Sequence, residues 1–307
     1  MGRQPGALGG RALAAVTFVC MPVPAQLAAI AERLRCPVCL HPLAAAQTSL
    51  ICSSGHTHDV TRHGYVTLRA PTGRSADGDD AAMIAARAAV QEAGHFDPLT
   101  SALVAAARAA GGSNSSLVLD VGAGTAHHLA GLLDALPHAR GIALDASRDA
   151  SRRAARRHER IAAVRTDVWQ QIPLGDGTAD LALSVFAPRN GAELARVVRP
   201  GGAVLVVTPT SAHLHELDTL HTVRVDPRKL ERLRRRLTPA WQARSVQPIS
   251  WTLELTRSEA EAVVRMGPAA RHLEPDLERR LAALSEPVFA TVAIELRTFR
   301  RSGARSE

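Results

Sequence analysis

The 307-residue sequence lacks two features that would place it in a membrane or outside the cell. It has no run of 18 apolar residues, so an ordinary membrane-spanning helix is excluded. It has only four cysteines, and three of them crowd between Cys36 and Cys52, which is typical of a metal site and not of a disulfide framework. Because thiolate ligands persist in a reducing compartment, we expect a cytoplasmic protein that has no membrane partner.

Lysine is almost absent. Lys229 is the only one, so arginine provides nearly all of the positive charge behind the net charge of +8. Arginine forks suit phosphates, which favours an acidic partner such as nucleic acid, although a GC-rich genome would produce the same composition. With 46% apolar residues the chain has enough material for a core and, at this length, for about two domains.

The first 25 residues have little pattern. Arg3 and Arg11 precede a short apolar patch that would suit a signal peptide. Export would separate the protein from the metal and cofactor chemistry inferred below. We therefore expect residues 1–25 to be a disordered extension, with Met21 as an alternative start.

The clustered cysteines belong to a metal-binding motif. The pattern C-x2-C-x12-C-x3-H is formed by Cys36, Cys39, Cys52 and His56. Three thiolates and an imidazole make a closed tetrahedral shell for Zn²⁺, which is a structural site with no open position for water. His41 and His58 are alternatives for the fourth ligand, but the ordinary Cys-x3-His step favours His56.

A small zinc-binding domain is predicted over residues 26–70. Residues 26–34 have the pattern of a short amphipathic helix, and residues 64–68 that of a strand that closes the domain. Tyr65, the only tyrosine, could stack on a base, but an aromatic in so small a domain is more often part of its core.

Residues 71–112 are expected to form a flexible connector followed by two helices. The helical patterns break at Gly94-His95-Phe96. These residues either face the cofactor or substrate or simply form a turn between helices.

A buried strand that runs into glycines marks the second domain. The apolar run 118–121 is typical of a parallel strand, and Gly122 and Gly124 then allow a tight turn. A helix is expected from His127 to Leu136, with its free N–H groups directed at whatever the loop holds. The dinucleotide fingerprint would need a third glycine where His127 stands, so binding of NAD is disfavoured.

Acidic residues at the ends of the next strands indicate which nucleotide is bound. Asp145 follows the glycine loop by about 20 residues, the distance at which a second strand presents a carboxylate to a ribose diol. Asp167 ends the next strand, where it could accept from an adenine amino group. The loop 186–190 follows the fourth strand and should face the reacting group. The candidate cofactor ligands are Asp120, Gly122, Gly124, Thr125, His127, His128, Asp145, Asp167 and Phe186.

Strands and helices alternate over residues 117–208, and strand patterns at 250–255 and 288–299 follow. We therefore expect an α/β fold over residues 113–307, a Rossmann-like doubly wound sheet with an antiparallel edge. Basic helices are expected over 148–160 and 227–237. A charged outer face is common on a helix that covers a sheet, so contact with RNA is the less favoured interpretation of the first helix.

These motifs together resemble the family of 23S ribosomal RNA guanine-N1 methyltransferases, from about Leu34 to the last strand. The pattern D-x-G-x-G with a strand-ending acid resembles motifs I and II of class I S-adenosylmethionine-dependent methyltransferases. The family marks are the Cys36-Cys39-Cys52-His56 motif, Ala85-Ala86-Arg87, Ala93-Gly94-His95, Asp120-Val121-Gly122-Ala123-Gly124-Thr125, Phe186-Ala187-Pro188-Arg189-Asn190 and Arg199-Pro200-Gly201-Gly202.

The resemblance implies S-adenosylmethionine as methyl donor and, as acceptor, N1 of a guanine in hairpin 35 of 23S rRNA. The branch that confers resistance to tylosin and mycinamicin methylates guanine 748, and a sister branch methylates guanine 745. The sequence is closer to the resistance branch, from whose motifs it departs at Ala126 and Ser184.

The chemistry of this acceptor needs an extruded base and a modest proton acceptor. Asn190, a backbone carbonyl or water could take the proton, and Glu193 and His213 are weaker candidates. Arg189 is assigned to RNA phosphate or base recognition, with a structural salt bridge as an equal alternative.

Other functions stay open at this stage. A small-molecule methyltransferase and a zinc-containing RNA-binding protein without catalysis would share many of these motifs. The sequence also leaves the oligomeric state open, including a homodimer.

Overall fold

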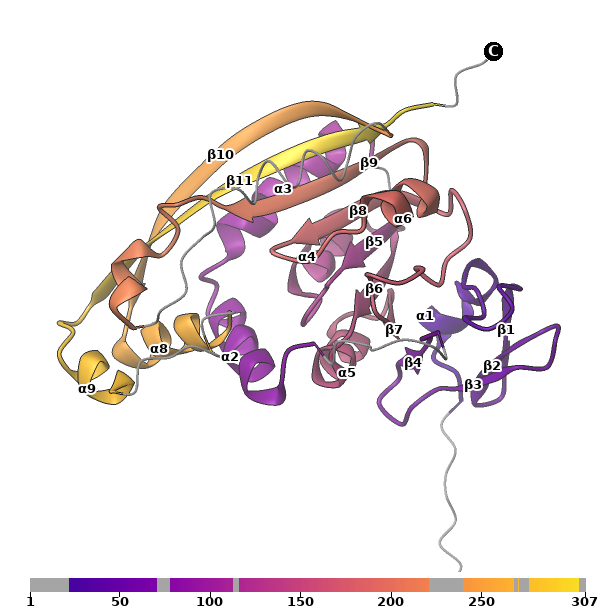
Figure 1. The fold of residues 1–307 in the computed structure, drawn as a ribbon, viewed down its shortest axis with the longest axis horizontal. Helices are drawn as coiled ribbons and strands as arrows, with labels where there is room; N and C mark the ends of the chain where they lie inside the picture. Colours follow the sequence, from indigo (N-terminus) through magenta and orange to yellow (C-terminus); the bar gives the residue numbers. More distant parts are fainter. Residues whose placement is uncertain are drawn as a thin grey trace, which may run out of the picture.

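The computed structural model describes residues 22–70, 78–112, 116–220, 240–267, 270 and 276–303. The basic helix expected over 227–237 and almost all of the expected extension lie outside these ranges. Within them, no helix combines the length and apolarity needed to cross a membrane. Figure 1 shows a small N-terminal domain beside one edge of a large sheet, while a long hairpin arches over the opposite edge.

The small domain is built around a three-stranded antiparallel sheet of β1 (Leu43–Ala46), β2 (Ser49–Cys52) and β3 (Thr57–Asp59). The helix expected over 26–34 is instead two single turns, α1 (Ala25–Ala28) and η1 (Ala31–Arg33). Helices this short have no stability of their own, so packing decides their shape. Here the two turns bury Leu27, Ile30 and Leu34 against the domain core.

The large sheet has eight strands in the order β10-β11-β9-β8-β5-β6-β7-β4. Neighbouring strands are parallel from β4 to β9, and β11 and β10 add an antiparallel edge. This confirms the predicted doubly wound sheet. The strands are β4 (Val66–Thr67), β5 (Leu117–Val121), β6 (Arg140–Asp145), β7 (Ile161–Arg165), β8 (Ala179–Val185), β9 (Val198–Pro209), β10 (Trp241–Leu255) and β11 (Val288–Arg301).

Most helices fall where the sequence predicted them. The basic helix α5 is shorter than expected and ends at Arg157, since the chain must become extended to enter β7 at Ile161. The helices are α2 (Ala81–Glu92), α3 (Asp97–Ala109), α4 (His127–Ala135), α5 (Arg148–Arg157), α6 (Gly191–Val197), η2 (His215–Leu220), α8 (Arg257–Arg265) and α9 (Leu277–Ala282).

The strand expected over 64–68 bridges to Val60 of the small domain through Val66 and also joins the large sheet. Its ordered part, β4, pairs in parallel with β7, with Val66 opposite Val164. Val66 and Leu68 are buried in the same apolar cluster as the large sheet, which explains why the segment joins that sheet's open edge. Tyr65 is buried, as the core interpretation predicted. The small domain is therefore attached to the large one through the sheet itself.

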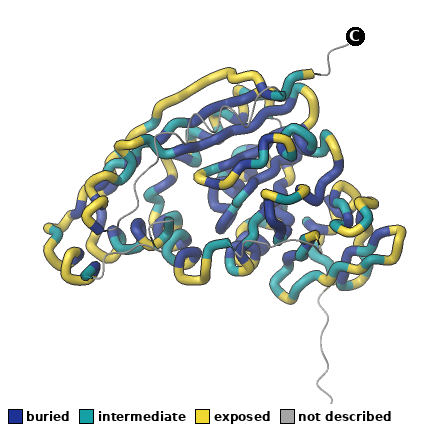
Figure 2. The backbone as a smooth tube through the Cα atoms, viewed as in Figure 1, coloured by how far each residue is buried: buried dark blue, intermediate teal, exposed yellow. Residues whose placement is uncertain are grey.

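The antiparallel hairpin is longer than its apolar pattern suggested. β10 extends from Trp241 to Leu255, whereas only its last six residues were predicted as strand. Most residues from 242 to 248 are exposed and polar, so they carry no alternating pattern, and pairing with β11 makes them a strand. Figure 2 shows burial concentrated in the central strands and β11, and exposure along the outer strand β10.

Candidate metal centre and cofactor pocket

The predicted zinc ligands converge on one point of the small domain. One ligand atom from each of the four residues lies within 4.8 Å of all the others, which suits a tetrahedral Zn²⁺ shell. Cys52 ends β2 and its Sγ lies 3.5 Å from Cys39 Sγ and 3.4 Å from His56 Nδ1. The four residues are Cys36, Cys39, Cys52 and His56.

The competing histidines lie outside this shell. His58 Nε2 is 3.4 Å from Cys36 Sγ, so it is placed to donate to that sulfur, and His41 Nδ1 bonds the hydroxyls of Ser53 and Ser54. Hydrogen bonding from the His41 backbone, followed by hydrogen bonds from neighbouring side chains, lowers the pKa of the Cys39 thiol to about 6, although loss of hydration acts in the opposite direction. The thiolate is the form that binds zinc. The geometry groups His56, and not His41 or His58, with the three cysteines, which supports the prediction of His56 as fourth ligand.

The glycine loop sits at the carboxyl end of β5 and touches the loop after β8. Gly122 has φ +71°, and a Cβ built on it would lie 2.5 Å from Cβ of Ala187. A side chain at this position would thus be strained and would also push the 186–190 loop away. The close approach explains why a glycine is needed here and brings the two predicted loops together.

Two carboxylates of the pocket fit a ligand that has a positive charge and hydroxyl groups. Burial raises the pKa of both Asp120 and Asp145, and the negative charge of Asp145 helps raise that of Asp120 to about 7. The backbone N–H groups of Gly124 and Ser147 each donate to Asp145 at 2.8 Å. These bonds orient the Asp145 carboxylate and leave lone pairs for a diol. A sulfonium nucleoside such as S-adenosylmethionine matches both requirements.

The two histidines at the start of α4 direct their rings away from the glycine loop. His127 Nδ1 lies 3.0 Å from an Arg157 nitrogen on α5, and His128 Nδ1 lies 2.8 Å from the Thr100 hydroxyl on α3. Burial, and then the charge of His127, lowers the pKa of His128 to about 3, so this ring is neutral. Any contact of this turn with a cofactor would come from its backbone N–H groups.

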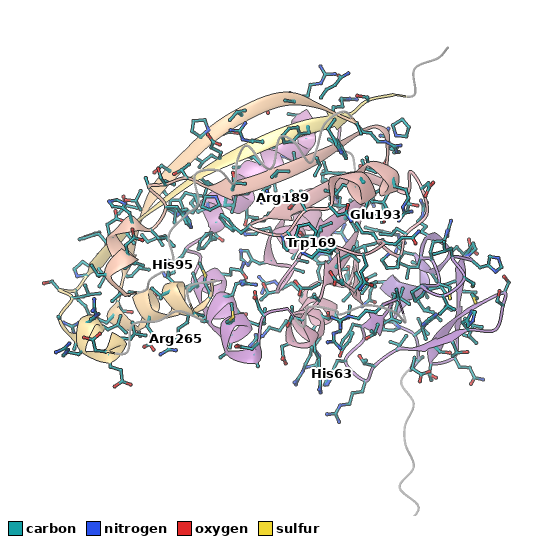
Figure 3. All side chains as sticks on the ribbon, viewed as in Figure 1. His63, His95, Trp169, Arg189, Glu193 and Arg265 are labelled. Atoms are coloured by element: carbon teal, nitrogen blue, oxygen red, sulfur yellow. The ribbon has the colours of Figure 1, made fainter. Side chains whose placement is uncertain are left out.

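Asp167 and Asn190 meet around one loop. Asp167 is buried, and its Oδ1 accepts from the backbone N–H of Trp169 at 2.9 Å. Asn190 caps α6 by accepting from the Glu193 N–H, and its Nδ2 donates to the Trp169 carbonyl at 3.2 Å. The β7 and β8 loops are thus tied together at the end of the sheet. The stick view shows Trp169, Arg189 and Glu193 in this central region (Figure 3).

Aromatic rings form a wall beside the 186–190 loop. Phe186 has φ +53°, an unusual value for a bulky residue, and its half-exposed ring lies 5.6 Å from that of His213. Phe96 packs edge-on against Phe186 at 6.4 Å and against Trp251 at 5.8 Å. The break is a turn between α2 and α3 that places Phe96 in this wall, and contact of Phe96 with a cofactor or substrate stays a prediction. Trp251 carried no sequence signal because it lies in the distant hairpin.

Arg189 and Glu193, the other residues predicted to act on the methyl acceptor, make contacts within the protein. Arg189 is buried, and its Nε donates to Ser184 Oγ at 3.1 Å, so its role toward RNA stays a prediction. Glu193 Oε2 accepts from Arg196 at 2.6 Å and from the Ile172 N–H at 2.7 Å. These bonds hold Glu193 in the α6 region and weaken its case as a proton acceptor.

Helix α2 covers the glycine loop, a role that the sequence did not reveal. Thr125 Oγ1 donates to Gln91 Oε1 at 2.5 Å, and an Arg87 nitrogen would lie 3.1 Å from a Cβ at Gly124. Arg87 also bonds Asp79 and the Met266 carbonyl, each at 2.6 Å. The Ala85-Ala86-Arg87 motif marked the segment, but only the tertiary packing shows where it lies.

Comparisons with known proteins agree with this geometry. Residues 34–70 match the family model described as RlmA, N-terminal, and residues 118–202 match the model of a methyltransferase domain. The fold and the site thus define an S-adenosylmethionine-dependent methyltransferase that carries an N-terminal zinc ribbon with a Cys3His cluster.

Two curated relatives identify the family. A protein from Micromonospora griseorubida described as a putative 23S rRNA guanine-N1 methyltransferase is 47% identical over 87% of this chain and 97% of its own length. The 23S rRNA (guanine(748)-N1)-methyltransferase of Streptomyces fradiae is also 47% identical, over 83% of this chain and 92% of its own. The chain belongs to the 23S rRNA guanine-N1 methyltransferase family.

Proposed function

We propose that the protein transfers the methyl group of S-adenosylmethionine to N1 of guanine 748 in hairpin 35 of 23S rRNA. The observation that carries this proposal is the 47% identity to the Streptomyces fradiae enzyme, whose name specifies that guanine, over nearly all of its length. We infer that the reaction takes place in the cytoplasm and confers resistance to tylosin-type macrolides. The zinc-binding domain would recognise the RNA.

Each candidate cofactor ligand has a role in this proposal. Asp145 would hold the ribose diol, Asp167 the adenine amino group, and Asp120 would face the positive charge. Gly122, Gly124 and Thr125 would form the floor of the pocket, and the first turn of α4, with His127 and His128, would supply backbone N–H groups. When bound, the cofactor supplies an electrophilic methyl group at the carboxyl end of β5 and β8.

N1 of guanine carries a weakly acidic proton and is masked by pairing in a duplex, so the base must leave the stack. The exposed ring of Phe186 offers a surface on which the extruded base can stack. Asn190 Oδ1, which already accepts from Glu193, would accept a hydrogen bond from N1–H and align the nitrogen, the proton would pass to water as N1 gains the methyl group, and Arg189 would hold the RNA. Positioning then provides most of the catalysis.

Primer extension tests the proposal, because methylation at N1 blocks base pairing. The protein is incubated with S-adenosylmethionine and an unmodified transcript that contains hairpin 35. A new stop at guanine 748 is expected. A stop at guanine 745 instead would assign the protein to the sister activity, and the absence of any stop, with labelled methyl transferred to neither guanine, would overturn the proposal.

A further inference from the structure

Helix α5 carries four exposed arginines that have no acidic partner. The helix's other basic side chain is engaged, since Arg157 contacts His127 and Glu92, while Arg160 beyond its end donates to three carbonyls around the end of α4. Within the described part of the chain, the remaining four form no ion pair. They are Arg148, Arg152, Arg153 and Arg156.

The zinc-binding domain extends this charge across the domain boundary. His63 Nδ1 lies 3.0 Å from an Arg156 nitrogen, and Arg62 Nε donates to His63 Nε2 at 3.4 Å. Loss of hydration, and then the positive charges of Arg152, Arg62, Arg156 and Arg148, lowers the pKa of His63. Arginines of both domains therefore surround one imidazole, which Figure 3 shows between α5 and the small domain. We call this the bipartite basic surface, and its members are Arg62, His63, Arg148, Arg152, Arg153 and Arg156.

A cavity joins this surface to one residue of the glycine loop. This cavity of about 480 Å³ lies between α2 and α5, lined on one side by Arg152, Arg153 and Arg156 and on the other by Ala88 and Thr125. Thr125 belongs to the glycine loop. Glu92 and Asp149 also line the cavity, but the arginines outnumber them. An anion in this cavity would lie next to the place where the methyl donor is held.

We propose that the bipartite basic surface binds the phosphodiester backbone of the RNA that carries the target guanine, with one phosphate in the cavity between α2 and α5. The inference rests on the proposed function, since it names the surface through which that substrate is held. Arginine forks match phosphate oxygens, and a surface formed by both domains would fix the RNA between the zinc ribbon and the methyl donor.

Charge reversal on α5 tests the inference. The variant Arg152→Glu/Arg153→Glu is compared with Arg244→Glu/Arg300→Glu, which makes the same charge change at exposed positions on the β10–β11 hairpin. Affinity for the hairpin 35 transcript is measured by anisotropy at several salt concentrations, and affinity for S-adenosylmethionine by calorimetry. The α5 variant should weaken RNA binding and raise KM for RNA at least about tenfold. It should also lower the slope of log Kd against log salt by about 1 to 2.

Cofactor affinity should stay within about twofold in both variants, and the hairpin variant should bind RNA nearly as the unaltered protein does. Equal weakening by both variants would overturn the inference, because net charge alone would explain it. Unchanged RNA affinity in the α5 variant would overturn it too, while methylation by the unaltered protein would leave the proposed function intact. Arg152→Gln/Arg153→Gln repeats the test if the charge reversal prevents folding.

Discussion

The metal centre and the cofactor pocket are built in opposite ways. All four metal ligands come from one short stretch, Cys36 to His56, whereas the pocket takes groups from strands β5 to β8 and is covered by α2. The small domain has three short strands, and its apolar residues share one cluster with the large sheet, whereas a second cluster lies on the large sheet and its helices. We therefore expect the small domain to depend on its ion more than the large sheet does. Local spacing therefore specifies the first site, and chain topology specifies the second.

Removal of zinc should give the largest effect and should separate the two regions. In His56→Ala, or after chelation, the small domain loses a contribution of about 10 kcal/mol or more, the range for structural zinc sites, and should unfold. Methylation of RNA should be lost, while cofactor binding by the large sheet persists. Zinc content, circular dichroism and calorimetry with S-adenosylmethionine measure the three outcomes.

The control for this experiment is His41→Ala, because His41 bonds two serine hydroxyls and lies outside the metal cluster. It should retain zinc and activity. If zinc loss also abolished cofactor binding, the two regions would be one cooperative unit, coupled through the pairing of β4 with β7.

A change in the glycine loop should weaken cofactor binding and leave zinc binding intact, the reverse of zinc removal. In Gly122→Ala, the new Cβ would overlap Ala187 and the residue would keep a positive φ, which together cost a few kcal/mol, or about 100-fold or more in cofactor affinity. Zinc content should not change. The matched control is Gly303→Ala, where no atom lies within 4 Å of an added Cβ. Normal cofactor affinity in Gly122→Ala would contradict the contact between the two loops.

The same contrast explains what the sequence could predict. Cys36 to His56 have a spacing that metal geometry dictates, so the ligand set could be predicted without knowledge of the fold. The glycine loop, Asp145 and Asp167 could be predicted because parallel strands bring their carboxyl ends to one edge. The order of alternating apolar segments likewise gave the sheet and most helices.

The features that escaped prediction depend on packing between distant segments. Residues 64–68 have the pattern of a strand, but nothing local says that β4 pairs with β7 as well as bridging to Val60 of the small domain. The polar part of β10 is a strand only because β11 pairs with it. Phe96 and Trp251 meet across more than half of the chain, and Gln91 reaches Thr125 only once α2 has packed.

The buried acid Asp120 predicts an effect on stability that depends on pH. Because the folded-state pKa of Asp120 is raised to about 7, the folded protein binds a proton more tightly than the unfolded chain, and this group's contribution to stability falls as pH rises from about 4 to 7. Asp120→Asn should therefore stabilise the ligand-free protein at pH 8 by up to about 4 kcal/mol, the value of a shift of about three units.

Thermal melts of the unaltered protein and Asp120→Asn at pH 5 and pH 8 measure this difference. The gap between them should be large at pH 8 and small at pH 5. If Asp120 faces the sulfonium as proposed, the variant should also bind S-adenosylmethionine more weakly, because it loses that negative charge. A gap that is equal at both pH values would contradict the raised pKa of Asp120.

The smallest expected effect concerns Asn190, which caps α6 and is also proposed to contact N1 of the target guanine. Its side chain caps α6, so Asn190→Ala should cost about 1 kcal/mol of stability, whereas Asn190→Ser keeps the cap and should cost only a few tenths. If Asn190 also accepts a hydrogen bond from guanine N1–H, both variants should lower kcat for RNA methylation tenfold or more with little change in KM for the cofactor. Full activity of Asn190→Ser would assign Asn190 to the helix cap alone, and a backbone carbonyl or water would then accept from N1–H.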